Sequence, residues 1–77
     1  MPKLPIVKEK QLVKALLKMG FFVHRQRGTS HLIMTHTDGR RTTIPIHPGK
    51  DIPKGTLKAI LNDLEINTEE LAKALGK

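Results

Sequence analysis

The sequence contains no cysteine, tryptophan or tyrosine in its 77 residues, and its two phenylalanines are adjacent, at positions 21 and 22. Without cysteine, disulfides and thiolate metal sites are excluded. With so few aromatic side chains, a surface that stacks successive bases is not expected. No apolar run approaches the ~20 residues of a membrane-spanning helix, and the N-terminus lacks the apolar stretch of a signal peptide. We therefore expect a cytoplasmic protein, not bound to a membrane, with one domain over residues 1–77.

Acidic residues are also scarce, with seven against 14 lysines and arginines, which gives a net charge of +7. The excess lies in residues 1–58, which hold twelve basic and three acidic side chains, whereas residues 59–77 hold two basic and four acidic ones. A cationic surface attracts polyanions and accelerates their encounter with the protein. The charge thus indicates a nucleic-acid partner, and a merely solubilising basic surface is the alternative.

Hydrophobic periodicity predicts one helix before and one helix after a group of strands. The segment VKEKQLVKALLKMGFF carries apolar residues at Val13, Leu16 and Leu17, and Gly20 is suited to end this helix. A second apolar stripe at helical spacing comprises Leu57, Ile60, Leu61 and Leu64.

Three short segments between these helices, FFVHRQ, HLIMTH and RTTIPI, have the composition of strands. Asp38-Gly39 predicts the turn between the last two strands, and Pro45 favours an edge position for the third. Asn67 and Glu70 have the spacing of a capping box that begins a further helix. We expect an α+β fold of order αβββα, with a three-stranded antiparallel sheet, both helices on one face, and an extra short C-terminal helix.

The segments KALLKMGFFVHRQRGTSH, DGRR and IPIHPGKDIPKGTLKAIL, taken in this order, closely resemble the HicA toxins, the YcfA-like family. The resemblance runs from about Lys8 to Leu64 and leaves the tail 65–77 outside. It implies a fold like that of a double-stranded-RNA-binding domain and the activity of an mRNA interferase, an endoribonuclease. It also implies a toxin–antitoxin pair in which a HicB-type antitoxin silences the toxin. No cofactor is expected.

The resemblance places the catalytic histidine of the family at His31, within GTSH, beside Gly28 and Ser30. Thr29, between this glycine and serine, departs from the Gly-Ser-His pattern of the family. The loop HPGKDIPKGT matches the second signature of the family through His47, Gly49, Lys50, Pro53, Gly55 and Thr56.

Histidine suits RNA cleavage because its side chain gains and loses a proton near neutral pH. Nearby cations, Arg25, Arg27 and the arginines of the second hairpin, disfavour a charged imidazole, so we expect His31 to be neutral and able to act as a base. The same arginines would hold the RNA. Without the resemblance, a histidine bonded to a backbone carbonyl at the start of a strand is the simpler interpretation of His31.

The other histidines have competing interpretations. If residues 27–30 form the hairpin loop, Gln26 faces His31 and His24 lies one diagonal away, where it could serve as a second acid or base. A one-residue slip would send His24 to the opposite face. His47 either helps to bind the scissile region or supports its loop, and His36 is most simply a solvated surface residue.

No metal site is expected, because the four histidines lack close ligand spacing and no paired carboxylates accompany them. By contrast, Lys50 and Lys54 bracket the start of the second helix, between Gly49 and Gly55. Free backbone N–H groups at a helix start bind anions, so we expect an RNA phosphate there, with a solvated turn as the alternative.

Three classes of function remain open from the residues alone. The leading one is an endoribonuclease that uses His31. The alternatives are a small RNA-binding domain without catalysis and an interaction protein whose basic surface meets an acidic partner.

Overall fold

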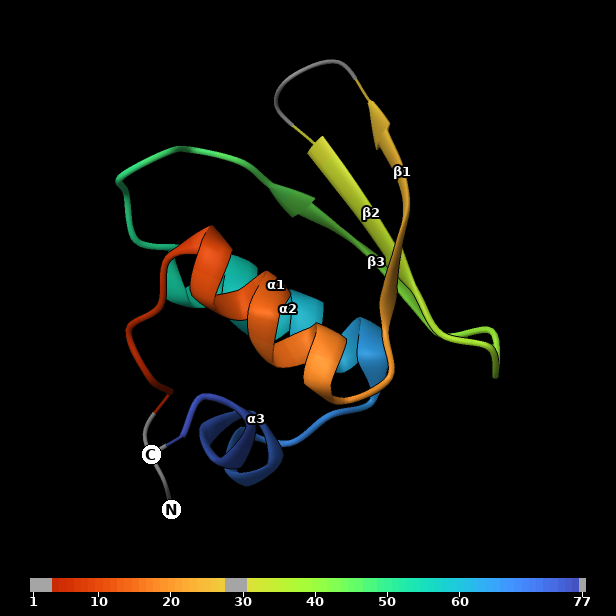
Figure 1. Ribbon diagram of the computed structural model, residues 1–77. Coiled ribbons are helices and arrows are strands. Elements are labelled where there is room, and N and C mark those ends of the chain that lie inside the picture. The colour runs from red at the N-terminus through yellow and green to blue at the C-terminus, as the bar shows by residue number, and fades with distance from the viewer. Residues whose placement is uncertain (1–3, 28–30, 77) are drawn as a thin grey trace.

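The computed structural model describes residues 4–27 and 31–76, and the side chains of Arg25, Gln26 and Arg27 are not part of that description. A helix, three strands and two further helices follow one another (Figure 1), in the predicted order. The elements are α1 Glu9–Lys18, β1 Phe22–Arg27, β2 His31–Thr35, β3 Arg41–Pro45, α2 Lys54–Leu64 and α3 Thr68–Ala74. The predicted α+β class and the extra C-terminal helix are confirmed.

The three strands form an antiparallel sheet in the order β1-β2-β3, so β2 is the central strand. Pro45 stands on the edge strand β3, as its missing N–H predicts. Side chains alternate between the two faces of a sheet, and Leu32, Met34 and Ile44 are buried beneath the helices. The opposite face is free of helices, and the β1–β2 hairpin extends past them (Figure 1).

Helices α1 and α2 lie on the same face of the sheet and close one hydrophobic core (Figure 1). The buried face of α1 consists of Leu12, Ala15 and Leu16, so the stripe expected at positions 13, 16 and 17 is wrong by one position. Leu17 is half exposed. The shift follows from packing, since the Leu12–Leu16 pair fills the core and the small Ala15 lets α3 approach α1. Gly20 has φ +94°, the left-handed conformation expected after a helix end.

The C-terminal helix α3 completes the core. Leu71 is fully buried, and α3 packs against α1. The predicted capping box is present, because the Glu70 backbone N–H donates to Asn67 Oδ1 at 2.8 Å and the Asn67 N–H donates to Glu70 Oε1 at 3.0 Å. This reciprocal pair stabilises a helix that would be too short to persist alone.

The loop between β3 and α2 is attached to the N-terminal segment. Lys8 Nζ lies 2.9 Å from Asp51 Oδ1, and the Ile52 backbone N–H donates to the Val7 carbonyl at 2.8 Å. Both Val7 and Ile52 are buried in the core. These contacts fix the chain that leads into α2, because they join it to the beginning of α1.

Arg40 links the β2–β3 turn to the end of α2. Its Nη1 donates to the Leu64 carbonyl at 2.8 Å, its Nε lies 2.9 Å from Asp38 Oδ2, and its guanidinium lies over the Phe21 ring at 5.0 Å from the centroid. A cation at the C-terminus of a helix is also favoured by the helix dipole. Arg40 is therefore a structural residue, contrary to the expectation that every hairpin arginine holds RNA.

His36 belongs to the same turn and is half-buried rather than a solvated surface residue. Its ring packs edge-on against Phe21, with 4.9 Å between the centroids, and its Nδ1 accepts the Asp38 backbone N–H at 3.1 Å. The Asp38 carboxylate lies 3.2 Å from the same nitrogen, so a protonated ring would also find a partner there. The histidine side chain thus supports the turn in either charge state.

Replacing Arg40 with methionine should lower the free energy of unfolding by about 1–2 kcal/mol, because the Leu64 carbonyl loses a charged donor. Urea denaturation measures this, with an unchanged m-value as the sign that only stability has changed. Arg41→Met is the matched control, since Arg41 is exposed, and should stay within about 0.5 kcal/mol of the wild type. Equal losses in the two variants would contradict the structural role of Arg40.

Asp38 should make stability depend on acid pH. The Arg40 backbone N–H donates to its carboxylate, and with the Arg40 guanidinium it lowers the pKa of Asp38 below its ordinary value. A carboxyl with a lowered folded-state pKa stabilises above the unfolded value of about 3.9 and loses this contribution as the pH falls through the folded value. The stability difference between wild type and Asp38→Asn should shrink as the pH falls below about 5. A difference independent of pH would show that the carboxylate charge is not involved.

Candidate functional site

His31 is the first residue of β2, and its side chain is exposed. Its neighbour Leu32 is buried beneath the helices, so strand alternation directs His31 to the helix-free face of the sheet. In the backbone register His31 pairs with Arg27 of β1 on one side and with Pro45 of β3 on the other. The histidine therefore lies at the hairpin end of the central strand and faces solvent.

An open groove of about 590 Å³ begins at this histidine. It crosses the outer face of β2 and β3 and continues around the edge strand to α2. The lining residues are His31, Ile33, Arg41, Thr42, Thr43 and Asp63. A groove of this form can admit an extended polymer, because it is open along its length.

The groove contains two opposite charges besides the histidine. Arg41 is exposed and forms no ion pair with the described part of the chain. Asp63 is held in place by the buried Thr42, whose hydroxyl donates to Asp63 Oδ2 at 2.9 Å. The sequence interpretation treated the two arginines of DGRR alike, although alternation along RTTIPI could have placed Arg41 on the outer face.

The register of the β1–β2 hairpin differs from the predicted one by a residue. Arg27, and not Gln26, pairs with His31, so the connection comprises residues 28–30 and is one residue shorter than expected. The register also shifts between Val23 and Arg25, which leaves His24 at a β-bulge. His24 lies three residues from Arg27, about 10 Å along the strand, and not one diagonal from His31.

Several predicted RNA contacts lie wholly or partly outside the described residues. Gly28 and Ser30 are outside, as are the side chains of Arg25 and Arg27. The backbone of Arg25 pairs with Ile33, two residues beyond His31 on β2. The expectation that these arginines hold RNA stays a prediction.

The second predicted anion site is at the start of α2. Lys50 is exposed in a turn in which its N–H donates to the His47 carbonyl at 3.0 Å, and Lys54 is the first residue of the helix. Pro53 provides no side-chain cap, and the first turn of α2 contains no acidic residue. The first backbone N–H groups of the helix thus have no side-chain acceptor at the cap. Within the described residues this turn is closed through the backbone carbonyl of His47, and the ring of His47 is exposed.

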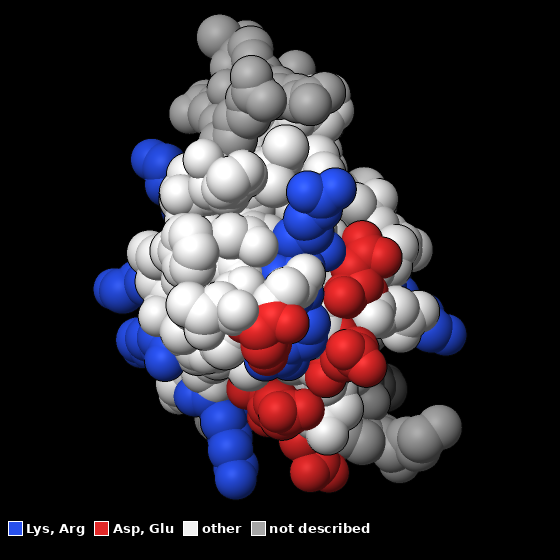
Figure 2. Space-filling view, turned by 90° about the vertical axis from the view of Figure 1, so that its right-hand side faces the viewer, with Lys and Arg blue, Asp and Glu red and all other residues white. Residues whose placement is uncertain are grey.

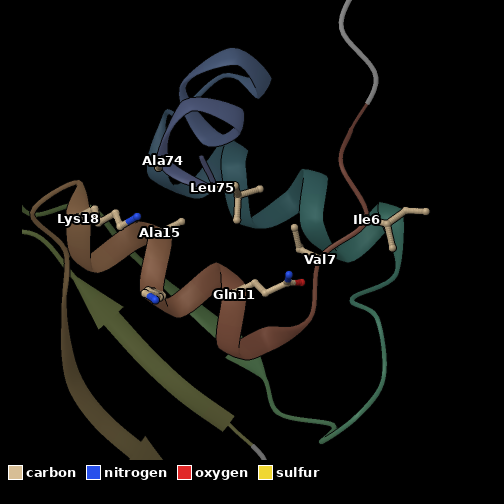
Figure 3. A pocket seen from close by; sticks show the side chains of 8 residues that line it. Ile6, Val7, Gln11, Ala15, Lys18, Ala74 and Leu75 are labelled. Atoms are coloured by element: carbon tan, nitrogen blue, oxygen red, sulfur yellow. The ribbon is translucent and has the colours of Figure 1, made fainter. Parts of the chain in front are cut away.

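A second hollow, of about 210 Å³, lies between α1, α3 and the N-terminal segment (Figure 3). Its lining consists of Ile6, Val7, Gln11, Lys14, Ala15, Lys18, Ala74 and Leu75. It contains no histidine or carboxylate. Of these two hollows, the sheet groove is therefore the one that contains a side chain able to exchange protons near neutral pH.

Residues 4–27 and 31–76 contain no group of three or more histidine or acidic side chains that could hold a metal ion. Within the same residues, no helix has both the length and the hydrophobicity required to cross a lipid bilayer.

Acidic side chains gather on one face of the molecule, seen in Figure 2, with basic side chains between them and around the rim. Five of the seven acidic residues belong to the β2–β3 turn, the end of α2 and α3: Asp38, Asp63, Glu65, Glu69 and Glu70. The charge asymmetry along the sequence thus becomes an asymmetry in space. Asp63 is the acidic residue that reaches the groove.

The fold and the groove define a small α+β domain that exposes a histidine on an open sheet. Residues 10–66 match a family model described as HicA toxin of bacterial toxin-antitoxin. The chain therefore belongs to the HicA toxin family. The matched region begins within α1, contains every residue of the groove, and ends before α3. A search of the curated proteins finds no match to the chain.

Proposed function

We propose that this toxin is an mRNA endoribonuclease in which His31 moves protons at the scissile phosphodiester. The observation that carries the proposal is the exposure of His31 at one end of an open groove that also contains an arginine. Family membership supports it, because the resemblance places the catalytic histidine at this position. A polyanion that crosses the groove would bring its backbone to the imidazole.

The chemistry needs no bound cofactor. The ribose 2′-hydroxyl attacks the adjacent phosphorus, the bond from phosphorus to the 5′-oxygen breaks, and the products are a 2′,3′-cyclic phosphate and a 5′-hydroxyl. His31 accepts the proton of the attacking hydroxyl or donates one to the departing oxygen, and a second group or water carries out the other transfer. Cationic side chains near the phosphate stabilise the charge that develops on its oxygens.

The sparse aromatic content indicates that RNA is held through its phosphates and its shape rather than by stacking, so loose sequence preference is expected. The start of α2, with Lys50 and Lys54, would supply a further phosphate contact.

The partner that we propose is a HicB-type antitoxin, and the site of action is the cytoplasm. A partner that covers the groove and the basic surface around it would need an acidic surface of its own. The alternative function is an RNA-binding domain without catalysis, which the same basic surface would also permit.

Replacing His31 with alanine should abolish cleavage of RNA by the purified protein and the growth arrest that its expression causes. RNA affinity should change by less than threefold, because the phosphate-binding cations remain, an expectation of about 0.6 kcal/mol at most. Fragment analysis and filter binding at low salt measure the two quantities.

His24→Ala is the matched control, since His24 is an exposed histidine on the same hairpin but lies about 10 Å along the strand from the pair of His31. It should retain cleavage. An RNA-binding wild type without cleavage, even without its partner, would favour the non-catalytic alternative.

The double variant Lys50→Ala, Lys54→Ala should bind RNA more weakly and with a shallower salt dependence. Each lost phosphate contact on a single strand reduces the slope of log K against log salt by about 0.7. The double variant Lys58→Ala, Lys73→Ala is the control, because it removes the same charge from other exposed helical positions. An unchanged slope in the first variant would remove the start of α2 from the RNA site.

A further inference from the structure

Arg41 and His31 share the groove but lie at different points along it. Pro45 is the register partner of His31, and Arg41 precedes Pro45 by four residues on β3. At about 3.3 Å per residue, Arg41 is about 13 Å along the strand from the level of the histidine. This spacing suits two phosphates of one strand better than a single phosphate held by both side chains.

The guanidinium of Arg41 is available for such a contact. It is exposed and forms no ion pair within the described part of the chain, whereas the adjacent Arg40 is engaged by Asp38 and the Leu64 carbonyl. The planar fork of arginine matches two oxygens of one phosphate. Of these two neighbouring arginines, Arg40 in the turn thus contacts the rest of the fold, and Arg41 at the start of β3 lines the groove.

Asp63 borders the groove beside Arg41, at the level of Thr42, which lies between Arg41 and Pro45 on β3. Its carboxylate is oriented by the Thr42 hydroxyl at 2.9 Å and lines the groove where it passes around the edge of β3. A fixed negative charge repels the next phosphate of an RNA strand. An RNA strand bound at Arg41 would therefore stay on the outer face of the sheet and not pass around the edge of β3 toward Asp63.

We infer that Arg41 forms a subsite for a phosphate that flanks the scissile phosphodiester, and that Asp63 keeps the strand at this subsite from passing around the edge of β3. The inference rests on the proposed function, in that it takes His31 as the point of cleavage. It assigns to Arg41 the binding of substrate outside the reacting bond, and to Asp63 a limit on where the strand can leave the sheet.

The test uses an oligoribonucleotide of defined cleavage position and a series in which one flanking phosphodiester at a time is a neutral methylphosphonate. At one flanking position, the neutral linkage should lower kcat/KM of the wild type by about threefold to tenfold, the range expected for an exposed charged hydrogen bond. The same linkage should have no effect on Arg41→Gln, because the contact is already absent. Arg41→Lys should retain part of the effect, since it keeps the charge and loses the fork.

Asp63→Asn should shift affinity in the opposite direction. The amide oxygen can still accept the Thr42 hydroxyl, so the variant removes the charge and leaves the contact, and it should bind the oligonucleotide more tightly. An uncleavable 2′-O-methyl version reports binding alone, and its salt slope should become shallower by about 0.7 in Arg41→Gln. Lys73→Gln, an exposed position on α3, is the charge-matched control and should change none of these quantities.

Additive effects of the neutral linkage and Arg41→Gln at every position would overturn the inference, as would equal affinity of Asp63→Asn and wild type. If the wild type cleaves no RNA but the binding slope changes in Arg41→Gln and the methylphosphonate effect on binding disappears in it, the proposed nuclease function fails and the subsite stands. If His31 is required for cleavage and the Arg41 variants behave as wild type, the nuclease function stands and the subsite fails.

Discussion

The alternation of side chains along β2 and β3 is the constraint on which both the core and the groove depend. Burial of Leu32 and Met34 on the central strand leaves its first residue no direction except outward. A slip of one residue would bring the imidazole and Arg41 into the hydrophobic interior and expose the apolar residues. The free energy of core burial therefore holds the groove residues in place, although they contribute little to that core themselves.

The adjacent residues Arg40 and Arg41 show the same link between stability and the groove. One stabilises the molecule by joining the β2–β3 turn to the end of α2, and the other lies in the groove. Removing the first would affect the second indirectly, because the turn and the start of β3 share a backbone. The acidic residue of the groove is likewise oriented by a hydroxyl from the core side of β3. Residues that stabilise the fold and residues that line the groove thus lie next to one another at the beginning of β3.

Local signals in the sequence predicted the elements well. The order of helices and strands, Gly20 after α1, the edge position of Pro45 and the Asn67–Glu70 capping box all follow from short-range chemistry, and the structure confirms them. The exposure of His31 has no such local signal, because Leu32, Ile33 and Met34 are all apolar and the structure alone shows that Leu32 and Met34 face the core.

The wrong predictions concern the buried face of α1 and the register of the β1–β2 hairpin, which local sequence does not determine. The buried face of α1 was displaced by a residue because the position of α3 decides it, and the hairpin register depended on a loop length that composition does not determine. The contact of Arg40 with Leu64 spans 24 positions and that of Thr42 with Asp63 spans 21, so no local sequence pattern predicts either contact. Sequence reasoning therefore missed Asp63 and did not distinguish Arg41 from Arg40, because tertiary packing decides the position of each.

The burial of Leu71 has a consequence for how this family is delimited. The matched segment stops at Ile66, yet Leu71, five residues later, is fully buried, and its helix α3 packs against α1. The matched segment and the packed core are therefore different lengths of polypeptide in this molecule. A chain that ended at Ile66 would leave the stretch of α1 under α3 to be covered by another element or by a bound protein.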